Sequence, residues 1–285
     1  MNRTVMAVLV VVAVLGGGLY LYLAQQPASP PSRTVEVPPE PPAPRYPVPT
    51  PPQTSKAPPP VQPPEPSPDT AGSAPEPAPP EPALPALGAS DGLAQQALQE
   101  SFTAADALSL FNLDGVIRRL VVTVDNLPRP QLPDKRLVVE TARGPFLVTG
   151  DGEDEYFIHP DNHRRYTPYV RLLESLDTDT FARLYVRYYP LLQAAYTELG
   201  YPDAYVNDRL VAVIDHLLAT PEVQRPVRLV RPHVLYKYAD PQLEALSAGQ
   251  KALIRMGPDN AGRVRAKLRE LRTRLVELAE VPVRD

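Results

Sequence analysis

Four polar side chains in the last third of the chain have the types and spacing that acid–base chemistry needs. Asp208 and Arg209 precede Asp215 and His216 by seven residues each. On a helix, seven residues make two turns, roughly 10 Å. A carboxylate beside a histidine can exchange protons with a substrate. The same residues on the polar side of a helix would instead form ion pairs or bind a partner. We assign no catalytic residue and treat the four as candidate binding residues.

Two other groups match metal sites only in part. His159 and His163 have a spacing that zinc ligands use on helices, but Pro160 disturbs the helical register and no third ligand is evident. The acidic turn at 151–155 lacks the glycine and the terminal glutamate of a calcium loop, which favours a charged hairpin tip. We therefore expect no metal site and no cofactor.

Tyrosines gather between Tyr166 and Tyr205, and arginines are interleaved with them. The tyrosines are Tyr166, Tyr169, Tyr185, Tyr188, Tyr189, Tyr196, Tyr201 and Tyr205. Tyrosine and arginine are enriched at binding hot spots, so this set could form a recognition surface. Tyrosines at helical spacing also pack at the edge of a core with a hydrogen-bonded hydroxyl. The sequence leaves both interpretations open.

The segment from Lys251 to Arg274 holds eight basic and two acidic residues. Such a segment could meet an acidic partner or an anionic lipid. A solvated helix face would have the same composition.

Helical periodicity identifies the elements that must position these residues. Apolar residues recur at helical spacing in the ranges 90–102, 112–126, 163–176, 178–199, 208–219, 241–256 and 259–280. Pro190 is expected to kink or divide the fourth of these helices, and Gly200 to end it.

Short apolar runs predict a small amount of β structure. The runs 146–148 and 156–158 flank Gly150 and Gly152, which indicates a hairpin, and 227–230 and 234–238 look extended. The fold class is therefore mainly α: a helical globular domain with one or two short β ribbons.

Proline divides the chain into regions. Of its 39 prolines, 25 lie between Pro27 and Pro85. A segment so rich in proline cannot bury enough apolar surface to offset its chain entropy. We predict a disordered proline-rich tether at 25–83 and a mainly helical globular domain at 84–285. The tether's PxxP patterns could bind an aromatic groove, but such patterns are unavoidable at this proline density, so we favour plain spacing.

The N-terminal region 1–24 has the pattern of a transmembrane anchor. Val5 to Ala24 is an uncharged run long enough to cross a bilayer as a helix, with Tyr20 and Tyr22 near one end. A cleaved signal peptide is the alternative, but Tyr22 is a poor fit to its small-residue cleavage site. Arg3 precedes the run, so the positive-inside rule places the N-terminus in the cytoplasm.

Composition excludes several functions. The net charge of −4 creates no field that would attract nucleic acid, so no nucleic-acid partner is expected. The absence of cysteine excludes disulfides, thiol catalysis and cysteine-ligated metals. No P-loop, nucleophile elbow, HExxH or dinucleotide fingerprint occurs.

Several stretches resemble a bacterial family known as domain of unknown function 3014. They are Ile117–Arg119, Thr123–Pro128, Gly144–Phe146, Glu198–Pro202, Asn207–Arg209, Val213–Leu218, Leu246–Lys251 and Arg255–Gly257. The resemblance covers most of 84–275 and implies an N-terminal anchor and a bacterial envelope location. It supplies no activity, ligand or catalytic residue.

These stretches, with the tyrosine set, define the candidate binding residues. They are Arg118, Arg119, Asp125, Asn126, Tyr166, Tyr201, Asn207, Asp208, Arg209, Asp215 and His216. We expect a single-pass protein of the bacterial inner membrane, held through Val5 to Ala24, whose C-terminal domain is periplasmic. The leading hypothesis is an envelope adaptor that binds another envelope protein. A module that binds peptidoglycan or another glycan is the alternative, and a hydrolytic enzyme is a third.

Overall fold

The computed structural model describes residues 83–101, 108–150 and 155–280. The predicted anchor at 1–24 and nearly all of the predicted tether at 25–83 lie outside these ranges. Among the described helices, none is both long and apolar enough to cross a membrane.

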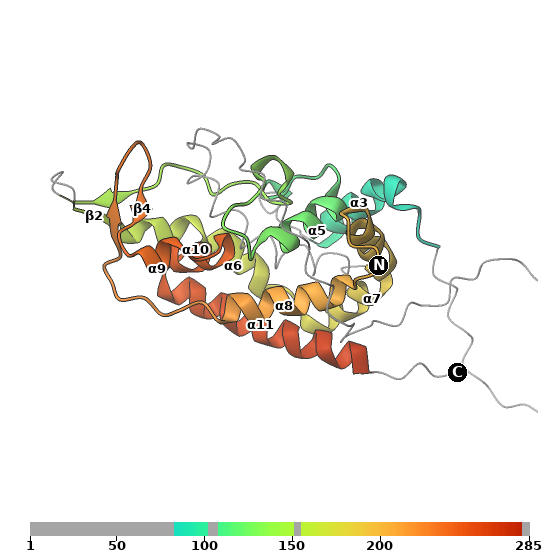
Figure 1. Ribbon diagram of the computed structural model, residues 1–285. Coiled ribbons are helices and arrows are strands. Elements are labelled where there is room, and N and C mark those ends of the chain that lie inside the picture. Colours follow the sequence, from blue (N-terminus) through green and yellow to red (C-terminus); the bar gives the residue numbers. More distant parts are fainter. Residues whose placement is uncertain (1–82, 102–107, 151–154, 281–285) are drawn as a thin grey trace, which may run out of the picture.

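The described chain is mainly helical, as the periodicity predicts (Figure 1). The α-helices are α3 (Asp91–Ser101), α5 (Val116–Asn126), α6 (Thr167–Glu174), α7 (Thr178–Glu198), α8 (Val206–Leu218), α9 (Pro241–Glu244), α10 (Ala248–Arg255) and α11 (Gly257–Glu280). Of three 3₁₀ segments in the described residues, Leu87–Ala89 precedes α3, and Asp134–Arg136 and Pro160–Arg165 lie between α5 and α6.

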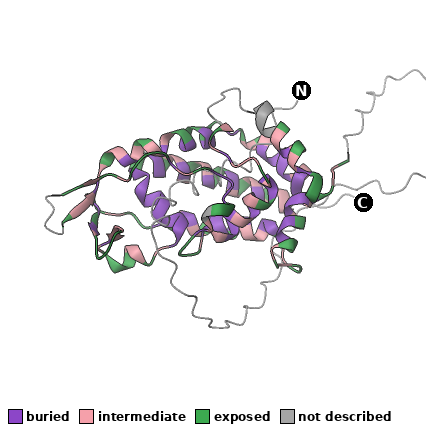
Figure 2. Ribbon diagram, turned by 90° about the horizontal axis from the view of Figure 1, so that it is seen from above, coloured by how far each residue is buried: buried purple, intermediate pink, exposed green. Residues whose placement is uncertain are grey.

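The main core forms around α11, the last helix. Val264, Leu268, Leu271 and Leu275 follow one another at spacings of four and three residues, and all four are completely buried. The helix that carries this row contacts α6, α7, α8 and α10. Figure 1 shows α11 running beneath α8, and Figure 2 shows the buried residues concentrated along the inner faces of the helices.

Pro190 does not divide α7, contrary to one of the outcomes expected from the sequence. The helix continues from Thr178 to Glu198 with Pro190 inside it. The residues on either side of the proline, Tyr189 and Leu191, are both buried. Packing therefore holds the two halves in one helix although proline removes a backbone hydrogen bond. Gly200, with a φ of 113°, follows the end of the helix as expected.

The two predicted ribbons join into one four-stranded antiparallel sheet. Its strands are β1 (Val148–Thr149), β2 (Tyr156–Ile158), β3 (Arg228–Val230) and β4 (Lys237–Tyr238), in that order. The joining pair is β2 with β3, in which Tyr156 lies opposite Leu229. One face carries Ile158, Leu229 and Tyr238, and these form a second, smaller core with Ile254 of α10.

The N-terminus of α10 docks on the C-terminal end of α5 through the backbone. The amide of Ala248 donates to the carbonyl of Arg129 at 2.8 Å, and that of Gly249 to the carbonyl of Leu127 at 3.0 Å. A Cβ on Gly249 would lie 3.1 Å from the carbonyl oxygen of Leu127 and 2.6 Å from a methyl of Leu217, so a larger residue would force these groups to shift. Carbonyls beyond one helix thus satisfy the first amides of another.

Removing one member of the α11 row is expected to cost the domain much of its stability. We expect the fragment 84–285 to be mainly helical and to unfold cooperatively in urea. Leu268→Ala should lower its free energy of unfolding by about 2–5 kcal/mol, because the side chain is fully buried. Arg269→Ala, at the exposed neighbouring position, should change it by less than about 0.5 kcal/mol. Equal losses in the two variants would mean that the row does not form the core.

Candidate functional site

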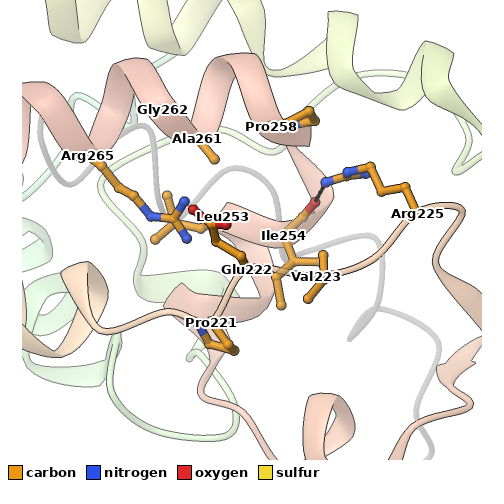
Figure 3. Close-up of a pocket in the computed structure, with 10 residues that line it drawn as sticks. All are labelled: Pro221, Glu222, Val223, Arg225, Leu253, Ile254, Pro258, Ala261, Gly262 and Arg265. Atoms are coloured by element: carbon orange, nitrogen blue, oxygen red, sulfur yellow. Dashed lines mark hydrogen bonds between the residues drawn. The ribbon is translucent and has the colours of Figure 1, made fainter.

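A cleft of about 310 Å³ lies between the segment that follows α8 and the helices α10 and α11 (Figure 3). The segment contributes Pro221, Glu222, Val223 and Arg225. The helices contribute Leu253, Ile254, Pro258, Ala261, Gly262 and Arg265. Three elements that are separate in the sequence therefore form it.

The floor of the cleft is apolar. Leu253 and Ile254 come from the last turn of α10, and both are buried. Ala261, in the second turn of α11, is buried beside them. Val223, on the connecting segment, is half-buried. An apolar ligand group would leave water when it bound here.

Two arginines from different elements line the cleft. Arg225 Nη2 donates to the carbonyl oxygen of Ile254 at 3.0 Å, and Arg265 Nη2 donates to that of Thr220 at 3.0 Å. Figure 3 shows the guanidinium groups in different parts of the cleft, on either side of Ile254. Burial lowers the pKa of Arg225, but a guanidinium remains charged at neutral pH. The cleft is therefore both apolar and cationic.

Arg265 also has a buried donor without an acceptor. Its Nε has no hydrogen-bond partner among the described residues. A buried donor in that state costs about 1–3 kcal/mol. A ligand oxygen would recover that cost only if neighbouring groups moved aside to admit it, since the atom is buried.

His163 stands behind Arg225. Its Nε2 lies 3.4 Å from Arg225 Nη1. Burial, and then the charge of Arg225, lower the pKa of His163, so the ring is neutral at pH 7 and can accept from the guanidinium. His159 accepts separately from the amide of Asp161 at 3.0 Å. Across the described residues, no three histidine, aspartate or glutamate side chains gather where they could hold a metal.

The lining offers little to a catalytic mechanism. Of the described residues around the cleft, Glu222 is the only one with a carboxylate, and none has an aromatic ring. General acid–base catalysis needs a positioned proton donor and acceptor at the reacting group. The arrangement is suited to binding an anion that carries apolar groups.

Three of the sequence-predicted residues meet elsewhere, around Asp125 at the end of α5. This residue is 2% exposed. Its Oδ1 accepts from Arg209 Nε at 2.9 Å, and its Oδ2 accepts from Arg129 Nη2 at 2.7 Å. The Tyr201 hydroxyl donates to Oδ2 at 3.4 Å and accepts from Arg129 at 3.2 Å. A buried carboxylate with these donors joins α5 to α8 and to the loop before it.

The tyrosines form core contacts in most cases rather than an exposed surface. Tyr166 and Tyr185 are each 1% exposed. The Tyr185 hydroxyl donates to Asn207 Oδ1 at 2.9 Å. The candidate binding residue Asn207 is therefore hydrogen-bonded inside the domain. Burial raises the pKa of Tyr196 to about 12, and its ring stacks on Tyr201 with centroids 4.7 Å apart.

The remaining polar residues of α8 point to separate partners. Asp215 pairs with Arg272 of α11 through both carboxylate oxygens. His216 Nε2 lies 2.8 Å from Ser247 Oγ. Ser247 is buried and caps α10, accepting from the amide of Gln250 at 3.3 Å. This serine–histidine pair therefore connects α8 to the start of α10. Asp208, one turn before the buried Val211, is partly exposed.

Three predicted residues of α5 bind neighbouring groups. Arg118 forms an exposed ion pair with Glu198 at 2.8 Å. Arg119 donates to the carbonyls of Asp114 at 2.6 Å and Lys135 at 2.7 Å. Asn126 donates to the carbonyl of Val122 at 2.7 Å. None of the predicted residues lines the cleft.

The sequence did not single out the residues that form the cleft or complete the Asp125 group. Arg265 lay within the basic segment, but nothing distinguished it from its neighbours. Arg225 follows a run without helical or strand periodicity. Arg129 is four residues beyond Asp125 and could have been paired with it by that spacing. The flanking Pro128 and Pro130 concealed the relation, because they indicate a loop.

Comparisons with known proteins give one family. The family model described as Protein of unknown function (DUF3014) matches residues 116–272, a range that includes the whole cleft and the Asp125 group. Comparison with curated proteins and with solved structures gave no match.

The buried and exposed Asp–Arg pairs should differ clearly in their contribution to stability. Asp125→Ala leaves Arg209 and Arg129 without their carboxylate, with an expected cost of about 3 kcal/mol. Asp215→Ala removes an exposed pair with Arg272, with an expected cost below about 1 kcal/mol. Urea unfolding of the two variants at neutral pH gives the comparison. A larger loss in Asp215→Ala than in Asp125→Ala would show that Asp125 does not hold α5 against α8.

Two histidines should make the fold sensitive to mild acid. Burial lowers the pKa of His163 and His216 from 6.5, assisted by Arg225 and Arg209 respectively. The unfolded chain then binds more protons than the native state below about pH 6.5, so stability falls as the pH decreases. His216→Gln should reduce the drop in melting temperature between about pH 7 and about pH 5.5. His233→Gln removes an exposed histidine and serves as the control. An unchanged drop in His216→Gln would exclude this contribution.

Proposed function

Since the chain belongs to the family described as Protein of unknown function (DUF3014), we propose that it is a membrane-tethered adaptor that binds another protein of the bacterial envelope. The anchor Val5 to Ala24 holds it in the inner membrane with the N-terminus in the cytoplasm. The tether at 25–83 carries the domain into the periplasm. This placement is supported by the uncharged apolar run, the position of Arg3 and the proline content.

The observation that favours protein binding is the character of the cleft. It combines an apolar floor of Leu253, Ile254 and Ala261 with two guanidinium groups. Apolar contact supplies affinity, and fixed charged donors supply orientation and specificity. Arginine is also among the residue types enriched at the energetic centres of protein interfaces.

The enzyme hypothesis has less support. The described lining has one carboxylate, on the exposed Glu222. The closest arrangement to a nucleophile and base, Ser247 with His216, has its serine buried and serving as a helix cap. A substrate would have to displace that cap to reach the hydroxyl.

A group of aromatic rings at the sheet favours a second candidate, binding of peptidoglycan or another glycan. Tyr156 and Tyr236 meet edge to face with centroids 5.1 Å apart, and Phe146 lies 6.3 Å from Tyr236. The guanidinium of Arg231 lies over the Tyr236 ring. The three rings are partly exposed, and partly exposed aromatic faces can hold sugar rings.

Crosslinking in living cells separates the candidates. A photoreactive amino acid replaces Val223, at the cleft, in the full-length protein. The control position is the exposed Asp203. Asp203 lies before α8 and the cleft segment lies after α8, and this helix is about 20 Å long. We expect one protein adduct from position 223 and none of that mass from position 203. The adaptor hypothesis fails if position 223 gives no protein adduct, and an adduct with glycan strands alone would favour the second candidate.

A further inference from the structure

We propose that the cleft recognises a short acidic peptide segment of the partner, in which apolar side chains lie between two carboxylates. This inference rests on the proposed function and specifies the chemistry of the partner at the cleft. Four observations carry it: the placement of the two arginines, the donor without an acceptor, the floor between the arginines, and the position of Glu222.

The two guanidinium groups are held apart. Arg225 is tied to the carbonyl oxygen of Ile254 and Arg265 to that of Thr220, each at 3.0 Å. Figure 3 shows them reaching into the cleft from different sides. A single phosphate or headgroup is bound by donors that converge on one point. Cations fixed in separate places fit a ligand that presents two separated anionic groups.

The donor without an acceptor indicates where one of these groups sits. Arg265 Nε is buried and lacks a partner within the described chain. Its guanidinium group is already oriented, since Nη2 is bonded to Thr220. A carboxylate oxygen is the acceptor that forms the strongest hydrogen bonds with a guanidinium. Because this atom is buried, a carboxylate oxygen reaches it only after neighbouring groups move aside.

The apolar floor between the arginines determines the chemistry of the part of the ligand that lies over it. Leu253, Ile254 and Ala261 offer no hydrogen-bonding side chain, so the part of the ligand that lies over them must be apolar. The volume of about 310 Å³ is at the lower end for ligand pockets. It suits a few side chains of an extended peptide and excludes a folded domain.

Glu222 limits where the ligand's charges can be. It is exposed, and in the view of Figure 3 its carboxylate lies on the Arg265 side of the cleft, away from Arg225. A ligand carboxylate placed near it would be repelled. The cleft therefore selects against a continuous acidic run, and a ligand carboxylate that approaches Arg265 does so against the charge of Glu222. Removing the charge of Glu222 should relax this selection.

The test measures peptide binding to the full-length protein in nanodiscs made of neutral lipid. The probes are fluorescent peptides in which two glutamates flank one, two or three leucines, with glycine and serine on both sides. Matched peptides replace glutamate with glutamine, or leucine with serine. Polarisation should show at least one Glu–Leu peptide binding at least tenfold more tightly than both of its matched forms, and increasing salt should weaken it.

Variants then locate the site. Arg265→Gln and Arg225→Gln should each weaken binding about tenfold or more, whereas Arg269→Gln, with the same charge change at an exposed position of α11, should leave it within about twofold. Glu222→Gln should strengthen binding, which a general loss of folding could not produce. Circular dichroism checks that each variant is folded.

Three results would overturn the inference. Glutamine peptides could bind as well as glutamate peptides, Arg269→Gln could weaken binding as much as Arg265→Gln, or vesicles of anionic lipid could bind at the cleft in preference to every peptide. If the Val223 crosslink to a protein is still obtained in cells, the adaptor function stands and only the acidic character of its partner is wrong. If that crosslink is absent as well, both fail.

Discussion

The fold depends on the burial of one face of its last helix. Val264, Leu268, Leu271 and Leu275 form a continuous apolar row on α11, and four other helices bury their own apolar faces against it. None of these shorter helices could bury its apolar face alone, since an amphipathic helix gains most of its stability from packing. The row also fixes the first turns of α11, and thereby the place of Arg265 beside the cleft.

The charges on α11 reinforce this packing from its edges. Arg263 pairs with Glu174 of α6, Arg272 with Asp215 of α8, and Arg274 with Asp179 of α7 at 3.3 Å. Each pair is partly exposed, so its contribution to stability is modest. Together they orient the helix relative to three neighbours. A segment whose composition suggested an acidic partner or a solvated face thus directs many of its charges to the domain itself. The Nε atoms of Arg265 and Arg274 are both buried donors without a partner among the described residues, and of these two arginines Arg265 is the one that lines the cleft.

How far the sequence predicted the structure depended on the range of the interactions. Helices α5, α8 and α11 were predictable because their apolar residues repeat every three or four positions, a local signal. The single sheet was not, because its joining pair, Tyr156 with Leu229, links strands of three residues that are distant in the chain. Asp125 and Arg209 were identified from short motifs, but the motifs could not show that they bind each other. The cleft escaped prediction altogether: the residues 221–225 have no periodicity, and their role exists only once α10 and α11 lie beside them.

The docking of α10 on α5 places the first amides of one helix against carbonyls that follow the end of another. The carbonyls of Leu127 and Arg129 accept from the amides at the positive end of α10. The amides that would otherwise attract an anion at the start of α10 are already neutralised by this contact. The contact also joins chain segments that are made far apart in time. A chain growing from its N-terminus cannot close its core until α10 and α11 have emerged, so the domain matures in a single late step.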